Sequence, residues 1–288
     1  ATAAAEAMTM ARRISKSRSN VFFVDNNTHP QSIAVIRTRA NFLGYEVVVG
    51  DPYTELQIRD FFGVLIQYPA STGCLKNPSE AISQAHAKGA LAVVASDLLA
   101  LTLIKPPGEM GADIVVGEGQ PLGSPITGGG PIYGIFACSK PYLRLMPGRI
   151  VGRSIDVDGK TAYCLTLSTR EQHIRRHRAT SNICTNETLI ALMGAMHMAL
   201  LGPEGLYDLA VRNMTACIMG KQKIATIDGI NMPHSNGEHF NEFAIELPGL
   251  TEDCLEYLDS VGIVGGFNLA SWYPNRTNWM LVTFTDQT

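Results

Sequence analysis

Short apolar runs alternate with amphipathic stretches through the first half of the chain. Val21–Asp25 has the continuous apolar pattern of a buried strand, and from Pro30 onward Ile33, Ile36 and Ala40 share one helical face. Further strands are expected at residues 45–49, 63–68, 91–95, 113–116 and 133–138, with a helix at residues 79–88. Apolar strands separated by helices predict a parallel or mixed sheet that is covered on both faces, so the expected fold class is α/β.

The pattern changes in the second half. Strands at residues 149–156 and 163–167 are expected to form a hairpin, because Asp158 and Gly159 favour a tight turn between them. A long helix is expected at residues 183–201, where apolar side chains recur at helical spacing. These side chains are Leu189, Leu192, Met193, Met196 and Leu200.

The end of the chain has strands and helices on a smaller scale. Gly202 and Pro203 are expected to end the long helix. The elements that follow are a helix at residues 206–223, a strand at 242–247, a helix at 251–261 and a strand at 279–284. We therefore expect a large α/β domain over residues 1–146 and a small C-terminal α+β domain over residues 147–288, which includes the long helix.

Composition and charge narrow the function classes. Of the 288 residues, 45% are hydrophobic and 17% charged, and 23 basic against 26 acidic side chains give a formal charge of −3. This balance disfavours nucleic acid as a partner, because phosphate-binding surfaces carry a basic excess. The six cysteines form no CxxC pair, so we expect reduced thiols and no metal site. No apolar run reaches the roughly 18 residues of a membrane span, so we expect a cytoplasmic protein without membrane contact.

Both ends of the chain have the pattern of an interrupted element. Ala1–Arg13 has the pattern of a helix interior without a capping residue. At the other end, the chain stops four residues after the strand expected at residues 279–284. We expect the sequence to be truncated at both ends.

Two glycine-rich stretches lie where an open α/β sheet places ligands. Gly117–Gly123 follows an expected strand, and Gly128, Gly129 and Gly130 precede the next one. Glycines there let backbone amides approach a phosphate, but the spacing is not that of a dinucleotide site, and a corner of closely packed backbones has the same composition. Asp97 follows another strand, where an acid can reach a bound cofactor or cap the next turn.

A dense basic stretch follows the expected hairpin. Residues 170–178 contain four arginines and two histidines but one acid, Glu171. Unpaired guanidinium groups repel one another unless an anion or a partner neutralises them, so the stretch is a candidate interface or ligand site, with a solvated surface as the alternative. Asn182 is also expected to cap the long helix. The candidate residues are Arg170, His173, Arg175, Arg176, Ser181 and Asn182.

Five segments carry a resemblance to one enzyme family. They read LIKPPGE at 103–109, GADIVVGEGQ at 111–120, MPGRIVG at 146–152, TREQHIRR at 169–176 and ATSNICT at 179–185. Through them the chain resembles, over essentially its whole length, glycine decarboxylase, the P-protein of the glycine cleavage system. The loop at residues 117–123 is similar to that of subunit 1, the α subunit of the two-subunit bacterial or archaeal enzyme.

The resemblance implies a fold and a chemistry. The family has the type I fold of pyridoxal 5'-phosphate (PLP) enzymes, with a three-layer, mostly parallel sheet and a small C-terminal domain. It decarboxylates glycine with PLP and transfers the aminomethyl group to the lipoyl arm of H-protein, which requires a lysine that holds PLP as an imine. In the sibling subunit a His-Lys pair precedes a glycine loop like that of residues 128–130. By that count the lysine position falls on Gln120 and the histidine position on Gly119.

An amide cannot form an imine with PLP, so the resemblance implies a supporting role for this chain. The expected partners are subunit 2, which supplies the lysine and most PLP contacts, and the lipoyl H-protein. This chain would keep a vestigial pocket around Asp97, Gln120 and the glycine loop at residues 128–130. Its Arg170–Asn182 stretch would face one of the two partners. Two alternatives are an autonomous PLP enzyme of the same fold and a non-catalytic scaffold or binding module.

Overall fold

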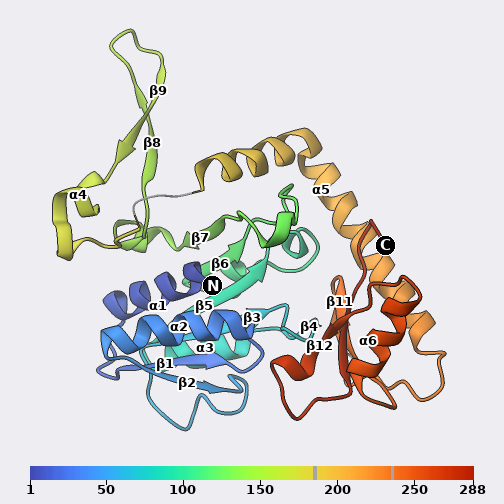
Figure 1. Cartoon of the computed structure of the whole chain (residues 1–288). Helices are drawn as coiled ribbons and strands as arrows, with labels where there is room; N and C mark the ends of the chain where they lie inside the picture. The colour runs from blue at the N-terminus through green and yellow to red at the C-terminus, as the bar shows by residue number, and fades with distance from the viewer. Residues whose placement is uncertain (184–186, 235–236) are drawn as a thin grey trace.

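A mixed six-stranded sheet forms the centre of the protein in the computed structural model, which describes residues 1–183, 187–234 and 237–288 (Figure 1). The strands run in the order β2, β1, β3, β5, β6, β7. Their bounds are Val21–Asp25 for β1, Glu46–Gly50 for β2, Gly63–Tyr68 for β3, Leu91–Asp97 for β5, Ile114–Glu118 for β6 and Gly134–Cys138 for β7. All neighbours are parallel except β7, which is antiparallel to β6. The expected α/β class is confirmed.

Helices cover both faces of this sheet, as the apolar strands required. They are α1 (Thr2–Ile14), α2 (Pro30–Leu43) and α3 (Ser79–Ala87). On one face Met8 of α1 and Ile36 of α2 are fully buried in the cluster that contains Phe22. On the other face Ile82 of α3 is buried in the cluster that contains Val94. Each such side chain stabilises the fold by roughly 1.5–3 kcal/mol, which holds the three layers together.

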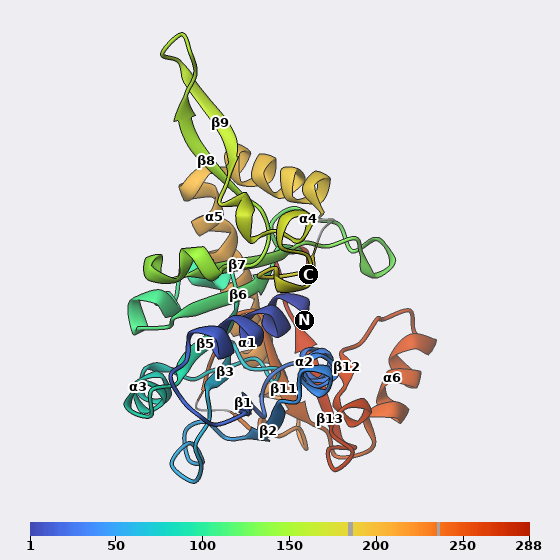
Figure 2. The same cartoon turned by 90° about the vertical axis from the view of Figure 1, so that its left-hand side faces the viewer.

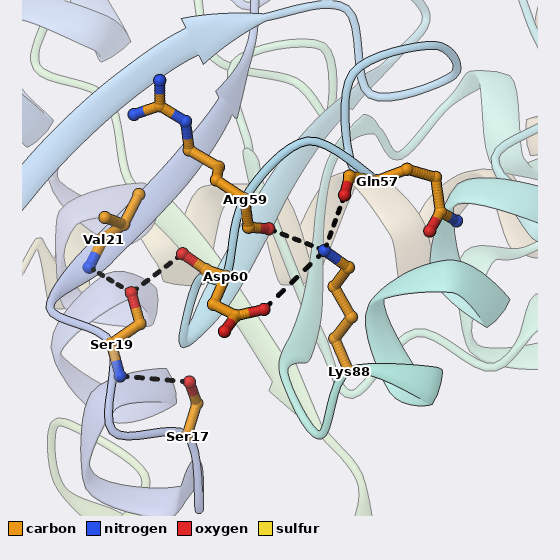
Figure 3. Close-up of polar contacts among 7 residues, drawn as sticks. All are labelled: Ser17, Ser19, Val21, Gln57, Arg59, Asp60 and Lys88. Atoms are coloured by element: carbon orange, nitrogen blue, oxygen red, sulfur yellow. Dashed lines mark hydrogen bonds and ion pairs between the residues drawn. The ribbon is translucent and has the colours of Figure 1, made fainter.

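One lysine ties the loop between β2 and β3 to the end of α3 (Figure 3). Lys88 Nζ donates to the carbonyl oxygens of Gln57 at 3.2 Å and Arg59 at 2.8 Å, and it lies 3.8 Å from Asp60 Oδ1. The Ser19 hydroxyl donates to the Asp60 carbonyl oxygen at 2.9 Å and accepts from the first amide of β1 at 3.1 Å. These bonds fix the amino ends of β1 and β3, opposite the edge at which α/β sheets bind ligands.

We expect Lys88→Ala to lower the free energy of unfolding by about 2 kcal/mol, because two carbonyl groups lose a charged donor. Chemical denaturation measures this loss. Lys160→Ala is the control, because Lys160 is exposed and lies 3.9 Å from Asp158 in the hairpin turn, and its expected effect is below about 0.5 kcal/mol. A Lys88→Ala loss as small as that of the control would contradict this role of Lys88.

A smaller antiparallel sheet packs at the C-terminal end of the chain. Its strands are, in spatial order, β11 (Glu242–Glu246), β13 (Trp279–Thr283) and β12 (Phe267–Asn268). Cys217 of the long helix and Leu255 of α6 (Thr251–Ser260) pack against its buried side chains. A two-residue ladder between β10 (Glu238–His239) and β4 (Cys74–Leu75) ties this region to the first half of the chain.

The expected hairpin is present and extends away from the central sheet in both views (Figures 1 and 2). Its strands β8 (Ile150–Ile155) and β9 (Thr161–Thr166) pair only with each other among the described strands. Apart from Ile150, the side chains on one face of the ribbon are small. The other face carries the exposed apolar side chains Val151, Ile155, Tyr163 and Leu165, together with Arg153 and Thr161. A two-stranded ribbon alone is marginally stable in water, and these exposed apolar side chains make the arm a candidate contact surface.

The long helix α5 (Thr188–Ile224) breaks at Gly202, as expected, where φ is 64°. The apolar stripe of its first half is open to solvent, with Leu189 at 72%, Leu192 at 54% and Met196 at 57% exposure. By length and composition α5 is, among the residues that the structure describes, the one helix able to cross a membrane. The break leaves residues 188–201, about 21 Å of helix, which is shorter than the roughly 30 Å of a bilayer core.

Asn182 does not cap α5, so that prediction was wrong. The helix begins at Thr188 with Glu187 as its N-cap. The Ser181 hydroxyl accepts the amide of Ile183 at 3.2 Å, a local turn that keeps the backbone out of a helix at this point. Residues 184–186 of the predicted helix, Cys184 among them, lie outside the described residues.

Candidate functional site

Asp97 lies at the carboxyl end of β5, the edge at which an open α/β sheet binds ligands. Its Oδ1 accepts hydrogen bonds from Leu99 N at 2.8 Å and Ala100 N at 3.1 Å. The carboxylate therefore caps the short helix η1 (Ala100–Thr102), which is one of the two roles that the sequence allows. Burial raises the pKa of Asp97 in spite of these two hydrogen bonds.

Gln120 follows β6, and its side chain is turned back onto its own loop. Its Nε2 donates to the Ser124 carbonyl oxygen at 3.1 Å, and its backbone N donates to Glu118 Oε1 at 2.9 Å. Gly119 has no room for a side chain, because a Cβ there would overlap the ring of Tyr133. An amide thus closes the loop at the position that the family resemblance assigns to the cofactor lysine.

The first half of α5 lies over this loop. Gly194 meets the Tyr133 hydroxyl and Gly123 meets the His197 side chain, each too closely for a Cβ on the glycine. Tyr133 Oη, His197 Nε2 and Ser124 Oγ are buried without a hydrogen-bond partner among the described residues. Because this face of α5 packs on the loop, the apolar stripe points away from the chain.

The residues described here do not fit a covalently held PLP. Gln120, which the family resemblance places at the lysine position, has its amide bonded within the loop, and Asp97 uses Oδ1 to cap η1. Gly128 and Gly129 are exposed in the turn before β7 and, like Gly130, have positive φ angles. Among the described residues, no three His, Cys, Asp or Glu side chains are placed to hold a metal ion, and the five described cysteines are free thiols.

A second acid approaches Asp97 from the small sheet. Burial, and then the negative charge of Asp97, raise the pKa of Glu242 on β11 to about 7. His239 has the opposite shift: burial, and then the charge of Lys221, lower its pKa to about 4. Lys221 Nζ lies 3.3 Å from His239 Nδ1. These ionisable groups come from distant parts of the sequence, so no local motif indicates them.

We expect Glu242→Gln to raise the free energy of unfolding by about 2 kcal/mol at pH 8 and to leave it unchanged at pH 4. The folded-state pKa of about 7 lies above the ordinary value of 4.5, so the folded state binds the proton more tightly. The stability that this protonated side chain contributes is fully present below pH 4.5 and is lost as the pH rises through 7. Denaturation from pH 4 to 8 measures the difference.

The control for this variant is Glu256→Gln on the exposed face of α6. Its effect should stay within about 0.5 kcal/mol across the same pH range. Equal effects of the two substitutions at pH 8 would contradict the burial of the Glu242 charge.

The basic stretch lines two cavities near the base of the hairpin. The first has a volume of about 260 Å³ and contains the one acid of the stretch, Glu171, together with Ser181. Glu171 Oε2 lies 3.2 Å from Arg149 Nε and 3.7 Å from His173 Nδ1. The positive charge of this cavity is therefore partly neutralised within the chain.

The second cavity, of about 270 Å³, is lined by four arginines and by no acid. They are Arg144, Arg170, Arg175 and Arg178. Arg170 also lines the first cavity and is fixed by carbonyl oxygens: Nε donates to Leu167 at 3.1 Å, Nη2 to Gly148 at 2.9 Å and Nη1 to Met146. Burial lowers the pKa of Arg170 from its ordinary value, and Glu171 opposes that effect.

The structure separates the candidate residues that the sequence indicates. The two cavities are not lined by the expected cofactor pocket, which is Asp97, Gln120 and the loop at residues 128–130. They are not lined by Arg176 or Asn182 either. Sequence reasoning missed Arg144 and Arg149, because they precede the hairpin while the other arginines follow it. The hairpin pairing is the signal that brings its two ends together.

Comparisons with known proteins identify the same family as the five segments that carry the sequence resemblance. The family model of the glycine cleavage system P-protein matches residues 1–272. Glycine dehydrogenase (decarboxylating) of Rhodopseudomonas palustris strain BisA53 is 54% identical over 209 residues, which are 73% of this chain and 22% of that protein. The protein of the same name from Rhizobium etli strain CIAT 652 is 51% identical over 222 residues, 77% of this chain and 23% of that protein. The chain spans less than a quarter of the length of these curated relatives.

Solved structures extend the likeness to the fold. A crystal structure of glycine decarboxylase (P-protein) of the glycine cleavage system, in inhibitor-bound form, matches with a TM-score of 0.90 and 35% identity, over 100% of this chain and 66% of that chain. A cysteine desulfurase from Escherichia coli matches with a TM-score of 0.66 and 15% identity, over 98% of this chain and 72% of that one, which shows the fold alone. The fold is that of the type I PLP enzymes. The chain belongs to the glycine cleavage system P-protein family.

Proposed function

We propose that this chain is the part of a glycine decarboxylase that supports the PLP-bearing part without holding PLP covalently itself. The whole enzyme decarboxylates glycine with PLP and passes the aminomethyl group to the lipoyl arm of H-protein. The observation that carries the proposal is Gln120: its amide nitrogen is not a nucleophile, and it is bonded to the Ser124 carbonyl oxygen. Family membership supports the activity of the assembly.

The partner in this proposal is subunit 2, which supplies the lysine and most of the PLP contacts. This chain offers two surfaces that need cover: the first half of α5 and the apolar face of the hairpin. Exposed apolar patches of this kind are typical of protein interfaces. The break at Gly202 favours a protein over a membrane as the cover, because the segment before it is too short for a span. The relatives named above are bacterial, and we place the assembly in the cytoplasm.

The first cavity provides the second part of the proposed interface. His173, Arg176 and Asn182 are exposed on the segment around it, and Ser181 lines it. This polar surface is proposed to face subunit 2 or the lipoyl H-protein. The apolar stripe of α5 supplies affinity, and the polar segment supplies orientation.

Reconstitution tests the proposal. The exchange of the glycine carboxyl carbon with bicarbonate is measured for the chain, for subunit 2 and for their mixture, each with PLP and lipoyl H-protein. We expect exchange that depends on both chains. Exchange by the chain alone identifies an autonomous PLP enzyme and contradicts the proposal. So does a chain that neither binds subunit 2 nor changes its activity, which is the result expected of a scaffold or binding module.

A further inference from the structure

The second cavity concentrates positive charge from three short helices, one before the hairpin and two after it, which the fold brings together at the base of the hairpin. The helices are η4 (Lys140–Leu145) with Arg144, α4 (Gln172–Arg175) with Arg175, and η6 (Arg176–Arg178) with Arg178. Like charges at such proximity repel one another, which destabilises the folded chain unless an anion neutralises them.

Two of the guanidinium groups are positioned by the backbone. Arg170 donates to three carbonyl oxygens, so its charge is fixed at the cavity wall. Arg175 Nε donates to the Thr169 carbonyl oxygen at 3.2 Å, which leaves both of its terminal nitrogens for a ligand. Groups held in this way lose little freedom when they bind, and this favours affinity.

The acids of the region are directed elsewhere. Glu171 faces the first cavity, where it pairs with Arg149 and His173. Among the residues that the structure describes, no carboxylate lies within 4.0 Å of the guanidinium nitrogens of Arg144, Arg175 or Arg178. The chain therefore supplies the charge of an anion site without its counter-ion.

Backbone strain is concentrated at the same place. Leu167, which lines the cavity, has φ of 54°, and Arg176 has φ of 53° with ψ of −122°. In the described part of the chain they are the two residues other than glycine with positive φ. Such backbone costs of order 1–3 kcal/mol each and persists where the surroundings fix it. Leu167 lies two residues before Thr169 of the cavity wall, and Arg176 lies between the cavity residues Arg175 and Arg178.

We propose that the second cavity binds a dianionic phosphate group, either inorganic phosphate or the phosphate of a small monoester. A dianion neutralises two of the four guanidinium charges, whereas a single carboxylate neutralises one. Thr169 and Thr180 line the same cavity and add hydroxyl donors for the remaining oxygens. The site uses residues of this chain alone, and it shares Arg170 with the first cavity of the proposed interface.

Isothermal titration calorimetry of the full chain tests this site, with inorganic phosphate and with glycerol phosphate at constant ionic strength. We expect saturable binding at one site. Arg144→Ala combined with Arg178→Ala should weaken it at least about tenfold. Arg149→Ala, in the first cavity, is the control and should change the affinity less than about twofold. Tighter binding of the ester assigns the site to a monoester, and equal binding assigns it to inorganic phosphate.

Three results overturn the proposal: no saturable binding of either phosphate, equal weakening by the control and the double variant, or binding of succinate as tight as that of phosphate. Thermal unfolding without phosphate establishes that each variant is folded. If the double variant is not folded, Arg178→Lys replaces it, because lysine keeps the charge but loses the planar fork of arginine. We expect its affinity for phosphate to lie between that of the wild type and that of the single variant Arg178→Ala. The same affinity for Arg178→Lys as for the wild type also overturns the proposal.

Discussion

Changing Leu192 and Met196 together to glutamate is expected to abolish the association of the chain with subunit 2. Both side chains are more than half exposed, and they lie about one turn apart on the uncovered stripe of α5. Burial of an apolar side chain contributes about 1.5–3 kcal/mol, and burial of an unpaired carboxylate costs several kcal/mol. The expected loss of affinity therefore exceeds about a hundredfold, and sedimentation velocity of the mixed chains measures it.

The control places two acids on the second half of the same helix. Arg212→Glu with Lys223→Glu changes exposed polar positions, and we expect a change in affinity below about fivefold. The Leu192 and Met196 double variant should also be less prone to self-association than the wild type. Wild-type affinity of that variant for subunit 2 would show that the stripe is not the interface.

Without subunit 2, the chain is expected to have less than about 1% of the glycine decarboxylation activity of the complex, because it offers no lysine at the position of Gln120. In the complex, Gln120→Ala should keep the activity within about threefold. The side chain closes its loop through one hydrogen bond to Ser124, which contributes about 1 kcal/mol to stability and nothing to chemistry.

Gln287→Ala is the matched control for that variant, because it removes an exposed amide near the end of the chain. Assays of carbon dioxide release measure both. A loss of a hundredfold or more in Gln120→Ala alone would show that the amide takes part in catalysis in this chain.

The strands of the central sheet could be predicted because each is an apolar run between polar turns. The strands Val21–Asp25 and Gly63–Tyr68 were placed to the residue, since all of their side chains are buried. The ladder between β4 and β10 could not be predicted: each strand is two residues long, and the pairing joins distant parts of the sequence. Asn182 misled because its type suits a cap, while the local backbone turns instead.

The candidate site was predictable by residue type but not by arrangement. The density of arginines after the hairpin indicated a charged site, and the cavity arginines 170, 175 and 178 come from that stretch. Arg144 was not linked to it, although the predicted hairpin of β8 with β9 brings the residues before it and the residues after it together. The capping role of Asp97 was one of two possibilities, and the geometry of η1 distinguishes them.

Borohydride trapping of the assembled complex tests the central claim most directly. Reduction converts an imine between PLP and a lysine into a stable amine, and peptide mass spectrometry then identifies the chain that carries the pyridoxyl group. We predict that the label is found on subunit 2 and on no lysine of this chain, whether this chain is alone or in the complex. A stoichiometric label on any lysine of this chain would contradict the account.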